Sequence, residues 1–208
     1  MSNKALSNES VNPSNASDNN GPDAVDGETR YLLLPLHSDV VFPGMTIGLP
    51  VQDPELANLI EETLPGRREV VVSTLKADSE DPPVANNFYP VGILGRVVQL
   101  IRKGGMLVVI FEGGDRANLQ DFYPTGRSYH VGIERLRSTS PPADDQYWQA
   151  AVRNLRDSAM QFFRRSQTSS QEVEGVIPGL PIGNTALLTD FIAGHLALSL
   201  EQKQSLLE

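Results

Sequence analysis

The residues of this chain that could carry out chemistry are few and widely spaced. The glycine pairs Gly104-Gly105 and Gly113-Gly114 could approach a phosphate closely, but neither is followed by the Lys-Ser/Thr pair of a P-loop. A Ser-Lys dyad needs a lysine desolvated beside its serine. The lysines are instead expected in a polar tail, at loop edges and on a capped helix: Lys4, Lys76, Lys103 and Lys203. We therefore expect no catalytic residue and no ATP hydrolysis in this segment.

Metal-ligating residues are equally sparse. The chain has no cysteine, and its three histidines lie far apart without ligand spacing: His37, His130 and His195. The sequence thus predicts no metal site and no cofactor in this segment. The absence of cysteine is compatible with a reducing cytoplasm, and the first thirty residues show neither a signal-peptide core nor an Arg-rich transit pattern. We expect a cytoplasmic protein.

The charge balance disfavours two classes of partner. The formal net charge is −9 at pH 7, so the chain lacks the basic surface with which proteins neutralise nucleic-acid phosphates or anionic lipids. No apolar run approaches the ~20 residues that a membrane-spanning helix requires. Nucleic acid and membrane are therefore disfavoured as partners.

The elements that must position any binding residues begin after a polar stretch. Residues 1–29 are dominated by Ser, Asn, Asp and Gly and contain almost no large apolar residue. Such a segment cannot bury enough surface to offset its chain entropy, which predicts a disordered tail.

Residues 30–138 favour short strands punctuated by glycine and proline. A continuous apolar run at 31–36 predicts a buried strand, and Lys103-Gly104-Gly105 predicts a hairpin between two further strands. The segment 112–115 is predicted to form a second turn. Asp53 is expected to cap the one helix, with Pro54 at its first position. We predict a small closed or half-closed β-barrel.

Residues 139–208 favour helices, so the fold class is α+β. One predicted buried stripe has spacings of four and three residues: Trp148, Val152, Leu155, Ala159 and Phe162. Short helices are also expected around 173–177 and over 187–196. Ser199 and Gln202 form a capping-box pattern. The helix that they open has only about two turns before Glu208, so we expect that the chain is truncated within a longer helix.

The order of these segments resembles the amino-terminal domain of ATP-dependent Lon proteases over about 31–208. The family's Leu-Pro-Leu strand, acidic residue, valines and aromatic-Pro match Leu34-Pro35-Leu36, Asp39 and 40–43. Its later motifs match Tyr89, Val91-Gly92, Gln99, Gly105, 112–117 and the terminal 201–208. The chain departs from the family where Val-Gly-Arg is usual, since it has Val51-Gln52-Asp53. It also lacks a motif usual in free-standing relatives, which favours a fragment of a true protease.

The resemblance implies a PUA-like β-barrel over 30–138 and a helical bundle over 139–208. It also implies a non-catalytic region of a serine protease with a Ser-Lys dyad and an AAA+ module, whose ATP and Mg bind outside this chain. Such a region would bind unfolded, damaged or degron-bearing proteins for quality control and support homohexamer assembly. The alternatives are a free-standing binding or oligomerisation module and, less favoured, a nucleic-acid reader.

A surface that binds unfolded polypeptide should keep apolar side chains near solvent. The candidates are turn-borne apolar residues, which sheet alternation does not bury: Phe42, Met45, Phe88 and Tyr89. Methionine suits such a surface because its thioether adapts to varied partners. The alternative is that Phe42 and Tyr89 close the ends of the barrel. Glu112 and Arg116 are expected to form a local ion pair that orients the turn between them.

Overall fold

The computed structural model describes residues 29–65, 68–77, 83–126, 128–139, 141–142, 144–165 and 185–208. The predicted disordered tail, except for Thr29, and the short helix expected around 173–177 lie outside these residues. None of the helices in the described ranges is both long enough and apolar enough to cross a membrane.

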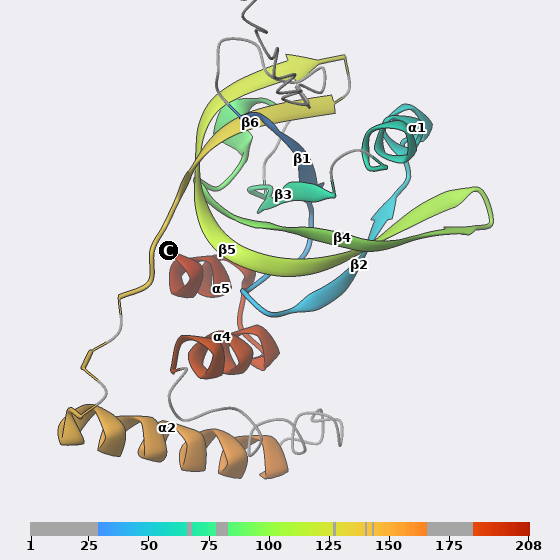
Figure 1. The fold of residues 1–208 in the computed structure, drawn as a ribbon. Helices are drawn as coiled ribbons and strands as arrows, with labels where there is room; N and C mark the ends of the chain where they lie inside the picture. Colours follow the sequence, from blue (N-terminus) through green and yellow to red (C-terminus); the bar gives the residue numbers. More distant parts are fainter. Residues whose placement is uncertain are drawn as a thin grey trace, which may run out of the picture.

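Six strands form one mixed sheet (Figure 1). Their bounds are β1 Tyr31–Leu36, β2 Thr46–Val51, β3 Glu69–Thr74, β4 Val91–Lys103, β5 Met106–Thr125 and β6 Ser128–Arg135. The order is β2-β5-β4-β3-β1-β6, and an additional pairing of β5 with β6 closes five of the strands into a cycle. Only β1 and β3 pair in parallel among these described strands.

The long strand β5 replaces the predicted turn at 112–115. It continues through this segment, and its register against β4 shifts at Leu94/Gly95, so that Gly114 is the extra residue of a bulge. A Cβ on Gly95 would lie 2.3 Å from the Glu112 carbonyl oxygen, and one on Gly114 would lie 2.7 Å from that of Leu94. Gly95 and Gly114 therefore allow the backbones of β4 and β5 to approach closely. This explains why glycines occur at 113–114 although the chain does not reverse direction there.

Both faces of the sheet are buried near β1 and β3. Leu32 and Leu34 belong to a core that includes α1, whereas Leu33 belongs to a second core with the aromatic residues Phe88 and Tyr129. A strand that is buried on both faces has no face on which polar residues are favoured. This explains the unbroken run of apolar residues in β1.

Helix α1, Pro54–Thr63, packs on the first of these cores through Leu56, Ala57 and Ile60. The predicted cap is confirmed, because the Asp53 side chain accepts from the backbone N–H groups of Glu55 and Leu56. A one-turn 3₁₀ helix, Ala85–Asn87, precedes β4.

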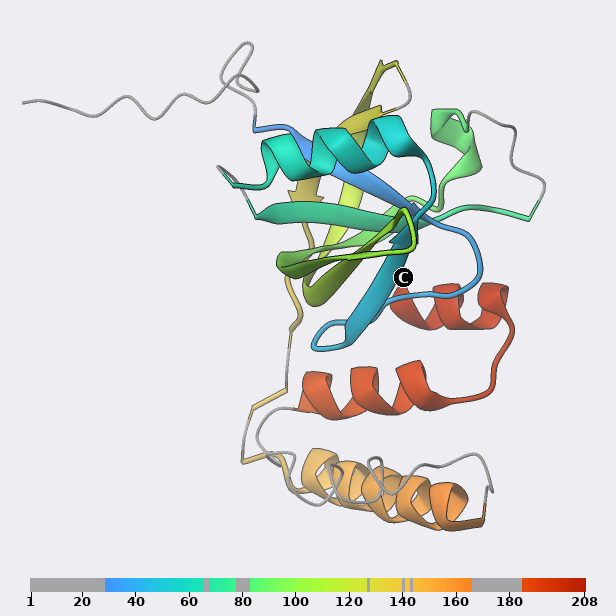
Figure 2. The same ribbon diagram turned by 90° about the vertical axis from the view of Figure 1, so that its right-hand side faces the viewer.

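Three helices form a stack on one side of the sheet, with α5 nearest to it, then α4, then α2 (Figures 1 and 2). They are α2 Gln146–Arg165, α4 Thr185–His195 and α5 Leu200–Leu207. The capping box that opens α5 is confirmed: Ser199 Oγ accepts from Gln202 N, and Gln202 Oε1 accepts from Ser199 N. The α+β class is confirmed.

The buried stripe of α2 differs from the predicted one at two positions. Val152 and Ala159 are buried in a cluster with α4, as expected, but Phe163 and not Phe162 joins them. Phe162 is 49% exposed and Leu155 is 37% exposed. Packing on α4 determines which side of α2 is buried. The sequence does not show which of the adjacent residues Phe162 and Phe163 lies on that side.

Candidate functional site

A groove of about 780 Å³ lies between the end of β1, the end of β2 and the start of α1. Its lining is mostly apolar and includes four prolines: Leu34, Pro35, Leu36, His37, Ser38, Leu49, Pro50, Val51, Gln52, Asp53, Pro54, Leu56, Pro83 and Tyr129. A concave, largely apolar surface with a few polar groups is the usual form of a binding site.

The wall formed by α1 is held in place by its cap. Asp53 Oδ1 accepts from Glu55 N at 2.8 Å and from Leu56 N at 3.2 Å. These bonds satisfy donors that the first turn of a helix leaves free. The carboxylate is therefore engaged by its own helix, and most of the other lining residues offer apolar contacts.

The groove offers little for catalysis. The ionisable side chains in its described lining are His37, Asp53 and Tyr129. No group of three His, Cys, Asp or Glu side chains that could hold a metal occurs among the described residues. The geometry supports binding by apolar contact.

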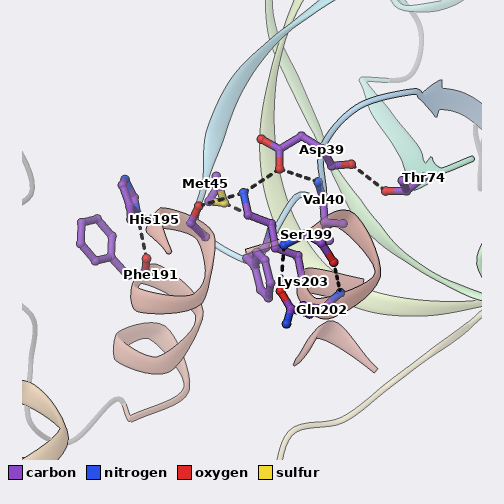
Figure 3. A network of polar contacts seen from close by, with 11 residues as sticks. Asp39, Val40, Met45, Thr74, Phe191, His195, Ser199, Gln202 and Lys203 are labelled. Carbon is purple, nitrogen blue, oxygen red and sulfur yellow. Dashed lines mark hydrogen bonds and ion pairs between the residues drawn. The ribbon is translucent and has the colours of Figure 1, made fainter. Parts of the chain in front are cut away.

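The loop between β1 and β2, which supplies His37 and Ser38 to the groove, is tied to both the sheet and the helices (Figure 3). The Asp39 carbonyl accepts from Thr74 Oγ1 at 2.9 Å. The Asp39 carboxylate accepts a hydrogen bond from Lys203 Nζ of α5 at 2.8 Å, and the Lys203 side chain is only 13% exposed. The position of this wall is thereby linked to α5.

Met45 lies at the other end of the same loop and packs against α4 (Figure 3). The Met45 side chain is partly buried against the core that includes α1. Its Sδ accepts a hydrogen bond from Phe42 N at 3.4 Å. A Cβ on Gly194 of α4 would lie 2.6 Å from that sulfur. Met45 is thus a contact between loop and helix, and binding of substrate by Met45 stays a prediction.

The expected exposure of the aromatic candidates is wrong for two of them. Phe42 is 0% exposed and Phe88 3% exposed. Phe88 packs on Phe122 and Tyr129, with ring centroids 5.6 and 5.9 Å away. Both side chains fill core clusters because the loops that carry them fold back onto the sheet. Substrate binding by Phe42 and Phe88 is not supported by their position.

Tyr89 is partly buried, so it stays a candidate, although it does not line the groove. Lys76 Nζ lies 5.9 Å from the centre of its ring. Burial raises the pKa of the Tyr89 hydroxyl above its ordinary value, and the nearby carboxylates of Glu201 and Glu208 raise it further. The hydroxyl is therefore neutral at physiological pH.

The predicted Glu112–Arg116 ion pair is wrong. Glu112 pairs with Arg96 of β4 at 2.8 Å. The Arg116 guanidinium donates to both oxygens of Asp190 in α4, and its Nε donates to the Leu207 carbonyl of α5 at 2.8 Å. The two residues lie in one continuous strand, and Arg116 joins the sheet to two helices.

The groove itself was not predicted from the sequence. Its walls come from segments that long-range strand pairing brings together, and no local sequence pattern indicates which segments will meet. The available signal was a proline inside each of two strands, Pro35 and Pro50, because prolines in strands occur at open edges.

Comparisons with known proteins agree on one family. A family model described as the ATP-dependent protease La (LON) substrate-binding domain matches residues 30–208. The Lon protease of Syntrophomonas wolfei subsp. wolfei is 30% identical over 177 residues, which are 85% of this chain and 21% of that protein. The chain spans about a fifth of the length of the curated relatives that it matches.

Two solved structures share the fold. The N-terminal domain of Mycobacterium avium complex Lon protease superposes with a TM-score of 0.66 at 16% identity, covering 86% of this chain and 89% of that chain. The Lon N-terminal domain protein from Xanthomonas campestris gives a TM-score of 0.57 at 19% identity, covering 86% and 90%.

Proposed function

The chain belongs to the family of Lon protease substrate-binding domains, and from this premise we propose that its groove binds exposed apolar segments of unfolded or damaged proteins. The observation that carries the proposal is the groove of about 780 Å³ with apolar walls at the ends of β1 and β2. Non-native proteins differ from folded ones in exposing apolar side chains, and such side chains gain free energy when a groove removes them from water.

The role of the whole protein follows as a wider proposal. The chain would be the non-catalytic amino-terminal region of an ATP-dependent serine endopeptidase, in which an AAA+ module uses ATP and Mg and a Ser-Lys dyad cleaves the peptide. Delivery of damaged or degron-bearing proteins to that machinery would serve quality control in the cytoplasm. A free-standing module that only binds is the alternative.

We also propose that the closed cycle of five strands is a PUA-like barrel and that α2, α4 and α5 form a helical bundle. The pairing of β5 with both β4 and β6 supports the first part. The cluster of Val152, Ala159 and Phe163 with Leu188 and Ile192 supports the second, because it buries α2 against α4.

A second candidate function is self-association, as in a homohexamer. Apolar side chains on α2 are solvent-exposed, with Tyr147 92%, Leu155 37% and Phe162 49% exposed. Replacing all three by serine should lower the molar mass measured by analytical ultracentrifugation, with binding of unfolded protein unchanged. A monomeric wild-type chain would exclude this function for the segment.

Groove binding is tested with a labelled, permanently unfolded protein in fluorescence anisotropy. Leu36→Ser should weaken binding by about threefold or more, because Leu36 is already partly buried in the free chain and full burial of a leucine side chain contributes roughly 1.5–3 kcal/mol. Leu206→Ser is the matched control, since Leu206 is 51% exposed on α5 and does not line the groove. Circular dichroism confirms that both variants are folded. Unchanged affinity of folded Leu36→Ser would refute the proposal.

A further inference from the structure

The two strand walls of the groove are sheet edges. Strand β1 pairs with β6 only as far as Leu33, whereas its pairing with β3 continues to Leu36. Strand β2 pairs with β5 alone among the strands of the described residues. The last residues of β1 and the whole of β2 therefore each have one side without a strand partner.

The open side of β1 presents Pro35. The Leu36 carbonyl accepts from Leu75 N at 2.8 Å, so the backbone of Leu36 points toward β3. Backbone polar groups of successive strand residues point to opposite sides. The backbone of Pro35 therefore points away from β3, and Pro35 lines the groove.

The open side of β2 presents Pro50 for the same reason. The Met45 carbonyl accepts from Gly113 N of β5 at 2.8 Å, and the register continues without a shift to Val51 opposite Leu107. Alternation then turns Pro50 away from β5, which agrees with the rule that strand prolines face an open edge. Pro50 also lines the groove.

We infer that the groove holds its ligand through side-chain contacts and not by adding the ligand to the sheet as another strand. The inference rests on the proposed function. In strand addition, the ligand's main chain exchanges hydrogen bonds with an open edge. The edge residue in each wall here is a proline, which has no N–H to donate. A ligand strand along either wall would leave a carbonyl without a partner.

The ligand that fits is an extended, apolar segment of a non-native polypeptide. Within the described lining the one carboxylate, Asp53, already accepts two backbone hydrogen bonds. Recognition without main-chain hydrogen bonds does not depend on ligand register and accepts prolines in the ligand.

The test compares two labelled peptides of one Leu/Phe-rich sequence, one unmodified and one methylated at alternate backbone nitrogens. Wild-type affinities should agree within about threefold, because no main-chain donor of the ligand is needed. A loss of about tenfold or more on methylation would overturn the binding mode. Failure of both peptides to bind would instead refute the proposed function.

A variant with Pro35→Val and Pro50→Val supplies the missing donors. The N–H groups at positions 35 and 50 can donate to ligand carbonyls, so the unmodified peptide could then add to the edge as a strand, whereas the N-methyl groups of the other peptide block strand pairing. The double variant should therefore prefer the unmodified peptide by about tenfold. Pro54→Val is the matched control, since Pro54 lines the groove from the first helical position. Equal binding of both peptides to the double variant would overturn the role of Pro35 and Pro50.

Discussion

The ion pair between Arg116 and Asp190 should be the polar contact on which attachment of the helices to the sheet depends most. The Arg116 side chain is 20% exposed and that of Asp190 only 5% exposed. Asp190→Ala removes two charge-assisted hydrogen bonds, and the Arg116 guanidinium keeps its hydrogen bond to the Leu207 carbonyl. Removing one partner of a buried pair typically destabilises by about 3–5 kcal/mol. A domain whose free energy of unfolding is about 5–15 kcal/mol would lose a large share of that free energy.

Urea denaturation followed by circular dichroism measures this loss. The control is Arg96→Ala, which breaks the exposed Arg96–Glu112 pair, where the side chains are 64% and 47% exposed. That variant should lose no more than about 1 kcal/mol. Replacing both Arg116 and Asp190 by apolar residues should recover most of the stability, because neither charge is then left buried alone. Equal losses for Asp190→Ala and Arg96→Ala would show that the Arg116–Asp190 pair is not the main polar contact between helices and sheet.

Three further predictions concern packing, the loop and pH. Phe88→Ala should destabilise by about 3–5 kcal/mol in urea denaturation, and a loss under 1 kcal/mol would contradict its place in the core. A double-mutant cycle on Asp39 and Lys203 should give a coupling of about 1 kcal/mol; zero coupling would show that the loop and α5 are independent. The hydrogen bond from Arg102 lowers the pKa of Glu61, so Arg102→Ala should raise that pKa in an NMR titration. The pair's stabilisation is present above the ordinary carboxyl pKa and disappears as the pH falls through the lowered value; an unchanged Glu61 pKa would contradict this.

Local signals in the sequence predicted local structure well. Asp53 with Pro54, and Ser199 with Gln202, each place a side-chain acceptor where the first turn of a helix needs one, and both caps are present. The hairpin at Gly104 and Gly105 follows from their positive φ angles of 58° and 85°.

Features set by long-range packing were missed. Glycine permits a turn and also permits two backbones to approach closely. The sequence therefore predicts a turn at Gly113-Gly114, whereas β5 continues through this segment with a bulge. Proximity in sequence predicts an ion pair between Arg116 and Glu112, whereas the partner of Arg116 is Asp190, 74 residues away. The groove depends on where β1 stops pairing with β6, and that is a property of the assembled sheet.

Site-directed photo-crosslinking tests most directly whether the groove binds non-native polypeptide. The chain has no cysteine, so Gln52→Cys provides a single attachment point for a benzophenone on the exposed rim of the groove. Gln161→Cys, on the exposed surface of α2, is the matched control. We predict crosslinks to an unfolded protein from position 52, competed by the apolar peptide, and few from position 161. Equal crosslinking from both positions, or crosslinking from 161 alone, would show that the groove is not the binding site.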